Sequence, residues 1–245
     1  MSYSGSRAKV RLFVDQPMGP GQPVALSGDH AHYLFNVMRL QAGAFVSVFN
    51  GSDGEWQAEI AETGKRGGVA ICRDQSAPQQ NPPDVWLMFA PIKKARTDFI
   101  VEKAAEMGAA RILPVQTQFT NSERLRQDRL QAHALEAAEQ CGGTFVPPVD
   151  DLQPLSRVLD SWDHARRILW ADESLVGAAS TLAAAAPGPW AILTGPEGGF
   201  SPAERERLRA LPFVTPVSLG PRILRADTAA VAALTLWQAH LGDWL

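Results

Sequence analysis

The sequence of 245 residues predicts two folded parts, a small β-barrel with one helical insert and a following α/β domain with a mainly parallel sheet. Apolar residues come in short alternating runs from Lys9 to Arg73, which is the periodicity of strands. Strand-like and helix-like segments alternate from residue 85 onward. Residues 75–84 between them are polar and rich in proline, so we expect an extended linker there.

The first domain, residues 1–74, is predicted to contain five strands and one helix. The helix is expected at about 29–40, and the turn-forming segment 50–54, Asn-Gly-Ser-Asp-Gly, is a strong hairpin signal. The expected strands are 12–14, 24–26, 45–49, 56–60 and 69–72.

The second domain, residues 85–245, is predicted to be a parallel sheet with helices on both faces. Ser201-Pro202-Ala203-Glu204 combines a capping box with proline at the first helical position, so a helix should begin there. The expected strands are 85–90, 112–115, 168–171, 190–194 and 214–219, and the expected helices are 97–107, 125–141, 203–211 and 228–241.

Two Gly-Pro loops each follow an apolar strand near the C-terminus. The first loop reads Gly195-Pro196-Glu197-Gly198-Gly199, and the second reads Gly220-Pro221-Arg222-Ile223-Leu224-Arg225. Glycine permits left-handed backbone and close approach to a ligand, and proline fixes φ. Because ligands of open α/β sheets bind beyond the carboxyl ends of the strands, we expect the two loops to form one ligand cradle. Neither loop has the residues of a dinucleotide or P-loop fingerprint.

The charge balance excludes an overall attraction to nucleic acid. The chain has 26 acidic and 23 basic residues and a formal net charge of −3, so RNA would have to be held by local cations. A basic segment with Lys93, Lys94 and Arg96 follows the first strand of the predicted sheet, where it suits phosphate contacts better than catalysis. Arg124 and Arg126 form a second basic segment.

The remaining composition indicates a cytoplasmic protein without a metal. Cys72 and Cys141 are far apart, no stretch has the length of a membrane span, and the N-terminus lacks the apolar core of a signal peptide. The five histidines form no metal-binding spacing, and no G-x-S-x-G elbow supplies a serine nucleophile.

The two loops, together with the Asp227-Thr228-Ala229 segment that follows them, resemble the SPOUT methyltransferases, and more narrowly the RsmE family of 16S rRNA (uracil-N3) methyltransferases. The resemblance covers nearly the whole chain: segments 11–14 and 37–40 are similar to the family's PUA-like RNA-binding domain, and segments 99–108, 122–124 and 136–142 to its middle motifs. Gly143 and Asp227 depart from the pattern, because the family usually has arginine and glutamate there.

The resemblance implies a SPOUT-type knotted, mainly parallel sheet with helices on both faces, preceded by a small PUA-like β-barrel domain. It also implies S-adenosylmethionine as cofactor, 16S rRNA of the small subunit as substrate and a homodimer, without membrane or DNA partners. We expect the dimer contact to include the apolar stripe of the last helix, Leu234, Trp237 and Leu241.

Specific residues are assigned on the same basis. Arg225 is expected to stabilise the developing uracil anion and Glu197 to act as base, although Glu197 could instead bind the cofactor or cap its loop. The expected cofactor-binding residues are Leu193, Thr194, Gly195, Gly198, Gly199, Leu219, Gly220, Ile223 and Leu224. The expected RNA-binding residues are Arg11, Arg39, Lys93, Lys94, Arg96, Arg124 and Arg126.

Two alternatives stay open. The chain could be a SPOUT methyltransferase for a ribose 2'-hydroxyl or a guanine, or a non-catalytic rRNA-binding module. The intact pair of Gly-Pro loops argues against the module.

Overall fold

The computed structural model describes residues 8, 10–64, 67–121, 124–175 and 185–244. These residues form two compact units. The first contains the described residues up to Asn81 together with Ala138–Val146, and the second contains Pro82–Ala137 and the described residues from Pro147 onward. Ala138–Val146, which the sequence placed within the second domain, therefore packs with the first unit.

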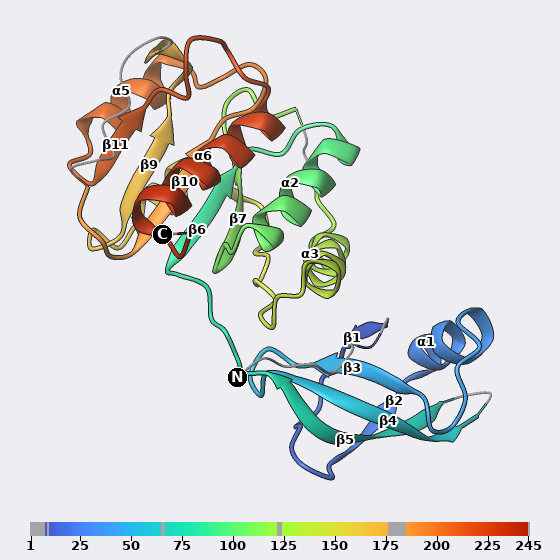
Figure 1. Cartoon of the computed structure of the whole chain (residues 1–245). Helices are drawn as coiled ribbons and strands as arrows, with labels where there is room; N and C mark the ends of the chain where they lie inside the picture. The colour runs from blue at the N-terminus through green and yellow to red at the C-terminus, as the bar shows by residue number, and fades with distance from the viewer. Residues whose placement is uncertain (1–7, 9, 65–66, 122–123, 176–184, 245) are drawn as a thin grey trace. The chain divides into compact units, whose positions relative to one another are not determined.

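The first unit is built on a five-stranded sheet with the order β1-β3-β4-β5-β2 (Figure 1). Neighbouring strands are antiparallel, except that β1 and β3 are parallel. The strands are β1 (Arg11–Phe13), β2 (Pro23–Leu26), β3 (Phe45–Phe49), β4 (Glu55–Thr63) and β5 (Gly68–Ala77). All five contribute to one apolar core, as the alternating pattern predicts.

Two elements of the first unit differ most from the prediction. The helical insert divides into α1 (Gly28–Ala31) and a π-helix, η1 (His32–Val37), and Arg39 follows with a φ of 55°, which ends the helix before Leu40. Strand β5 extends to Ala77, so residues 75–77 of the expected linker pair with β4 instead.

The second unit contains a parallel sheet with the order β11-β9-β10-β6-β7-β8, which confirms the predicted sheet type. Its strands are β6 (Val85–Phe89), β7 (Arg111–Gln116), β8 (Gln153–Pro154), β9 (Arg167–Ala171), β10 (Trp190–Thr194) and β11 (Val214–Val217). Its helices are α2 (Lys94–Glu106), α3 (Gln127–Cys141, whose last turn belongs to the first unit), α4 (Leu155–Asp160), the 3-10 helix η2 (Glu173–Leu175), α5 (Pro202–Ala210) and α6 (Ala226–Leu241). The short elements β8, α4 and η2 were not predicted.

Helices cover both faces of this sheet. Helix α6 packs against α2 and crosses β6 and β10 (Figure 1). Residues of α4 and α5 share a core with the other side chains of β10, among them Ala191 and Leu193. The predicted capping box of α5 is present, with both bonds between Ser201 and Glu204 formed. No helix in the described part of the chain is long and apolar enough to cross a membrane.

Two of the three residues of the apolar stripe of α6 are used inside the chain, whereas Leu241 is half-buried. Leu234 and Trp237 are 0% and 1% exposed. Because α6 packs on α2, β6 and β10, Leu234 and Trp237 are buried within their own unit, which corrects their expected place in a dimer contact.

Candidate functional site

A cavity of about 250 Å³ lies at the carboxyl edge of the parallel sheet. The last residues of three adjacent strands border it, namely Ala171 of β9, Thr194 of β10 and Val217 of β11. Both Gly-Pro loops contribute to its wall, so the structure brings together two segments that are separated by a helix and a strand. The ligand cradle expected from the sequence is therefore a single cavity, which is partly open to solvent.

All predicted cofactor-binding residues except Leu193 line this cavity, and so does Glu197. Leu193 is 0% exposed and packs in the core with α4 and α5 residues. Side chains alternate along a strand, so Leu193 points to the opposite face from Thr194. Leu193 is corrected from a ligand contact to a core residue.

The first loop is enclosed by protein atoms. A Cβ on Gly195 would lie 2.7 Å from the ring of Phe200, and a Cβ on Gly199 would collide with the carboxylate of Glu173. Gly199 also has a φ of +69°, which favours glycine. No other residue fits at either position without displacing its neighbours.

An acidic pair behind the first loop was missed by the sequence reasoning. Asp172 and Glu173 follow β9 and line the cavity. Asp172 is 2% exposed and accepts hydrogen bonds from Ser174, Arg205 and Arg209. Arg205 bridges to Glu173 and donates to the carbonyl of Phe200 at 2.9 Å. Their position directly after a buried strand was the only signal that could have found them.

The charge of Asp172 is stabilised by these contacts. Burial alone raises the pKa of Asp172, but the hydrogen bonds from Ser174 and Arg209 outweigh this effect, and the pKa lies below its ordinary value. Asp172 therefore holds η2 and α5 together as an ionised group.

The second loop is open. Gly220 has a φ of +111°, yet a Cβ there would meet no atom within 4 Å. Ile223 lines the cavity and is 76% exposed. Arg222 also borders the cavity, whereas Arg225 is an exposed residue at the N-cap of α6, directly before the lining residue Ala226.

Thr194 carries an unsatisfied polar atom at the cavity wall. The residue is 1% exposed, and its Oγ1 has no hydrogen-bond partner among the described residues, although its carbonyl accepts from Ala90 at 3.0 Å. Leaving such a hydroxyl unpaired costs about 1–3 kcal/mol. A polar ligand group that reaches this buried oxygen would recover that cost.

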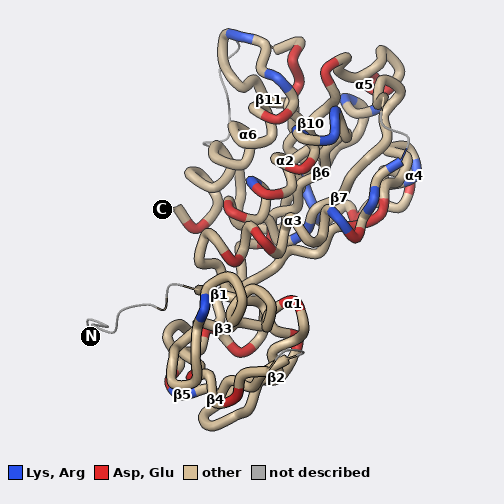
Figure 2. The backbone as a smooth tube through the Cα atoms, turned by 90° about the vertical axis from the view of Figure 1, so that its right-hand side faces the viewer, with Lys and Arg blue, Asp and Glu red and all other residues tan. Residues whose placement is uncertain are grey.

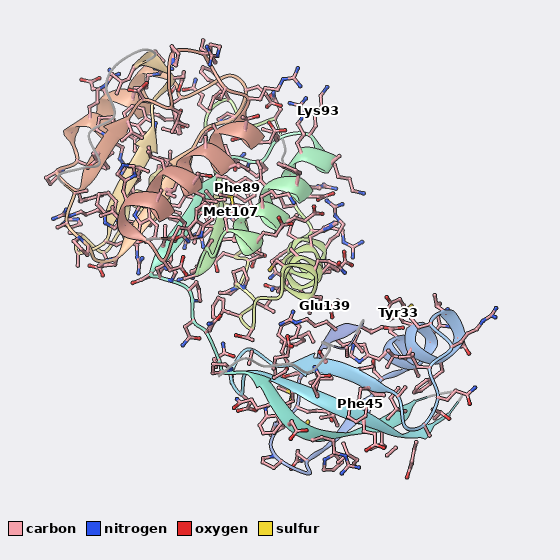
Figure 3. All side chains as sticks on the ribbon, viewed as in Figure 1. Tyr33, Phe45, Phe89, Lys93, Met107 and Glu139 are labelled. Atoms are coloured by element: carbon pink, nitrogen blue, oxygen red, sulfur yellow. The ribbon has the colours of Figure 1, made fainter. Side chains whose placement is uncertain are left out.

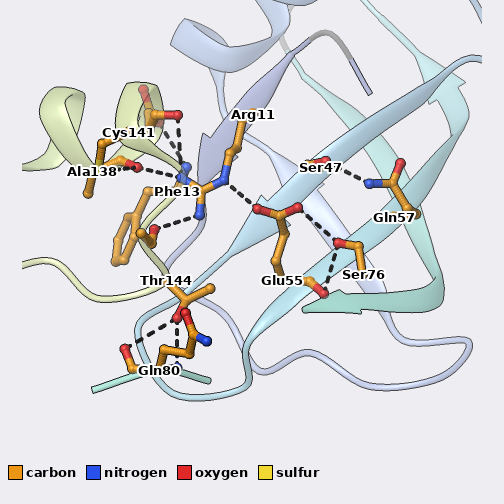
Figure 4. Close-up of polar contacts among 12 residues, drawn as sticks. Arg11, Phe13, Ser47, Glu55, Gln57, Ser76, Gln80, Ala138, Cys141 and Thr144 are labelled. Carbon is orange, nitrogen blue, oxygen red and sulfur yellow. Dashed lines mark hydrogen bonds and ion pairs between the residues drawn. The ribbon is translucent and has the colours of Figure 1, made fainter. Parts of the chain in front are cut away.

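The expectation that Arg11 contacts RNA is corrected by the contacts of its side chain within the protein (Figure 4). Its side chain is 9% exposed, lies over the ring of Phe49 and forms an ion pair of 2.5 Å with Glu55. It also donates to the carbonyls of Ala138 and Gly143, which belong to the same unit. Because the guanidinium is enclosed by these acceptors, Arg11 stabilises the first unit and is not available to a phosphate.

The other predicted cations differ in how open they are. Arg39, Lys93, Lys94 and Arg124 are exposed, and Lys93 occupies the position directly before α2 (Figure 3). The remaining two have acidic partners: Arg126 with Asp128 at 2.6 Å and Arg96 with Asp227 at 3.7 Å. Basic and acidic positions are interspersed along the backbone (Figure 2).

Two family models match the chain. The model of the RNA methyltransferase domain matches residues 79–238, and that of the RNA methyltransferase PUA domain matches residues 26–71. The ribosomal RNA small subunit methyltransferase E of Mycobacterium bovis is 30% identical, with 95% of each chain covered. The protein of the same name from Rickettsia conorii is 28% identical, with 91% of this chain and 93% of the relative covered.

Solved structures show the same fold. A protein from Legionella pneumophila in complex with the cofactor SAM superposes with a TM-score of 0.87 at 26% identity, over 97% of this chain and 99% of that chain. A ribosomal RNA small subunit methyltransferase E from Neisseria gonorrhoeae bound to S-adenosyl methionine gives 0.85 at 24% identity, over 96% and 99%. The expected fold class, a SPOUT-type knotted sheet preceded by a PUA-like domain, is confirmed.

Proposed function

Because this chain belongs to the ribosomal RNA small subunit methyltransferase E family, it is an rRNA methyltransferase, and we propose that it methylates N3 of a specific uridine in 16S rRNA with S-adenosylmethionine as donor. The observation that carries the proposal is the single cavity that both Gly-Pro loops form at the carboxyl edge of the parallel sheet.

The residues of the cavity fit this cofactor. Thr194 Oγ1 offers a hydrogen bond that the described residues leave unused, and Gly220 leaves open space where any other residue would place a side chain. Leu219, Ile223 and Leu224 supply the apolar walls that the faces of an adenine require. When bound, S-adenosylmethionine supplies a methyl group that is activated by its positive sulfur.

The acceptor needs help from the chain because N3 of uracil carries a proton. We propose that the Glu197 carboxylate at the cavity takes this proton while the N3–carbon bond forms and the sulfur–carbon bond breaks. The exposed Arg225 would stabilise the negative charge that develops on the uracil ring. The protein otherwise aligns donor and acceptor.

We propose that RNA is held by the exposed cations Arg39, Lys93, Lys94 and Arg124, with smaller contributions from Arg96 and Arg126, which have acidic partners. Each lost phosphate contact should lower the salt slope of RNA binding by about 0.7–0.9. Arg39→Ala should show this change, and RNA titrations at several salt concentrations measure it. An unchanged slope would remove Arg39 from the RNA surface.

We also propose a cytoplasmic homodimer, in which the first unit, with β5 extending to Ala77, is the RNA-binding domain and the second unit is the methyltransferase domain. Since Leu234 and Trp237 are buried, we propose that the dimer contact uses Leu241 and exposed residues instead. Light scattering at micromolar concentration should return twice the mass of one chain. The mass of a single chain would contradict the dimer.

The function is tested by mass spectrometry of digested rRNA. A deletion strain should lack one N3-methyluridine in its 16S rRNA, and purified protein with S-adenosylmethionine should restore that mark. A missing ribose or guanine methylation would point to a different target, and unchanged rRNA together with RNA binding would indicate a non-catalytic module.

A further inference from the structure

A rigid turn beside the first Gly-Pro loop presents an aromatic ring to solvent. Phe119 lies in the segment after β7 and is 39% exposed. Thr117 and Thr120 close the turn, with Thr117 N donating to Thr120 Oγ1 at 2.9 Å and Thr120 N donating to the Thr117 carbonyl at 3.2 Å. Gln118 N donates to Glu204 Oε1 at 2.8 Å, which ties the turn to the start of α5. The backbone around Phe119 is therefore fixed although its ring is not buried.

Phe119 adjoins the wall of the cavity. A Cβ on Gly198 would lie 3.1 Å from Cβ of Phe119 and 3.5 Å from its Cγ, so the two residues are in contact. Gly198 lines the cavity, whereas Phe119 does not. The ring consequently lies next to the first Gly-Pro loop but outside the cavity that a cofactor would fill.

This ring differs from the other exposed phenylalanine of the second unit. Phe99 on α2 has the ammonium of Lys103 5.4 Å from its ring centroid. No such cation or ring contact involves Phe119 among the described residues. An exposed ring on a fixed turn suits a flat ligand. The ring can stack on such a ligand without a hydrogen-bonding or charged group from the protein.

We propose that Phe119 is a positioning residue that stacks on the target uracil of the substrate RNA, which rests on the proposed methylation of uracil N3. That atom lies on the pairing edge of the base, so the base has to leave its helix and its stacking neighbours. An aromatic side chain replaces the lost stacking and leaves the edge of the base unobstructed. Stacked on Phe119, the uracil would direct N3 toward the methyl donor behind Gly198.

The test compares Phe119→Ala and Phe119→Leu with Phe119→Tyr in the full-length protein. Single-turnover methylation is measured against RNA concentration, and cofactor affinity is measured by calorimetry. Stacking on one base is worth about 5-fold to 150-fold, so the Ala and Leu variants should lose that much in methylation efficiency. The Tyr variant should stay close to the unaltered protein, and all three should bind S-adenosylmethionine normally.

A chemical footprint gives a readout that does not depend on turnover. Permanganate oxidises an unstacked uracil at its C5–C6 bond, so the target base should be protected in the complex with the unaltered protein and with Phe119→Tyr. It should become reactive with Phe119→Ala at saturating protein.

Several outcomes would overturn the proposal. Full methylation efficiency of Phe119→Ala or Phe119→Leu would show that the ring is not needed. Loss of cofactor affinity, or a change of mass in light scattering, would assign Phe119 to loop packing or to a subunit contact. If the unaltered protein fails to methylate uracil N3, the proposed function itself fails, and this inference falls with it.

Discussion

The two Gly-Pro loops border the same cavity but are supported in opposite ways. In the first loop, a Cβ added to Gly195 would meet Phe200. A Cβ on Gly198 would meet Phe119, and one on Gly199 would meet Glu173. In the second loop, a Cβ added to Gly220 would meet nothing within 4 Å, and Ile223 is 76% exposed. The first loop is therefore fixed by contacts within the protein, whereas the second loop is open and leaves space for a ligand.

The charges around the two loops follow the same division. Arg205, behind the first loop, donates hydrogen bonds to Asp172, to Glu173 and to the carbonyl of Phe200. Arg225 at the end of the second loop is exposed. Two arginines near one cavity therefore differ: Arg205 is held by protein groups, and Arg225 is exposed to solvent.

Glycine replacement in the two loops is expected to have the largest effects. Gly199→Val should abolish cofactor binding and lower the free energy of unfolding by about 3 kcal/mol or more, because it adds left-handed strain to a collision with Glu173. Gly220→Val should also abolish cofactor binding but cost only about 1–3 kcal/mol, since the open loop can relax. Calorimetry and urea unfolding measure both quantities. Equal losses of stability would contradict the difference between the loops.

Arginine replacement tests this difference. Arg225→Ala should lower the single-turnover methylation rate about 100-fold, as loss of a group that stabilises developing charge does, and leave stability within about 0.5 kcal/mol. Arg205→Ala should instead cost about 2 kcal/mol of stability, because it removes hydrogen bonds to charged groups. Rapid-quench assays and urea unfolding distinguish the variants. A normal methylation rate in Arg225→Ala would exclude its catalytic role.

Much of the fold could be predicted because local patterns determine it. The apolar run of β6 and the capping box at Ser201 and Glu204 specify their elements without help from distant residues. The π-helix after Ala31 and the two-residue strand β8 carry no comparable pattern. Their form depends on packing, which the local sequence does not reveal.

The two loops of the site could be predicted from the sequence, but the ion-pair partners of its charged residues could not. The glycines gave the positions of both loops, since left-handed backbone at Gly199 and Gly220 requires that residue type. Arg11 shows the limit, because its acceptor Glu55 lies 44 residues away. The fold decides whether a cation contacts a carboxylate or the solvent, so Arg11 could not be assigned to RNA binding from the sequence alone.

A smaller effect is expected at the base of the cavity. Thr194→Val removes the unpaired hydroxyl while keeping the shape of the side chain, so it should stabilise the protein without ligand by about 1 kcal/mol. The same change should weaken S-adenosylmethionine binding about 10-fold, because the hydrogen bond to the ligand is lost. Thr194→Ser is the matched control and should keep the affinity. Unchanged calorimetry for Thr194→Val would mean that the ligand does not use this hydroxyl.

The smallest expected effect is the pH dependence of the support behind the first loop. The pKa of Asp172 is lowered in the folded protein, because hydrogen bonds from Ser174 and Arg209 outweigh the burial that raises it. Its stabilising contribution is therefore fully present above the unfolded pKa of about 4 and is lost as the pH falls through the lower folded value. Asp172→Asn should be less stable than the unaltered protein at neutral pH, and the gap should narrow below about pH 4. Urea unfolding at both pH values measures it, and a gap that stays constant would show that Asp172 does not support the loop through its charge.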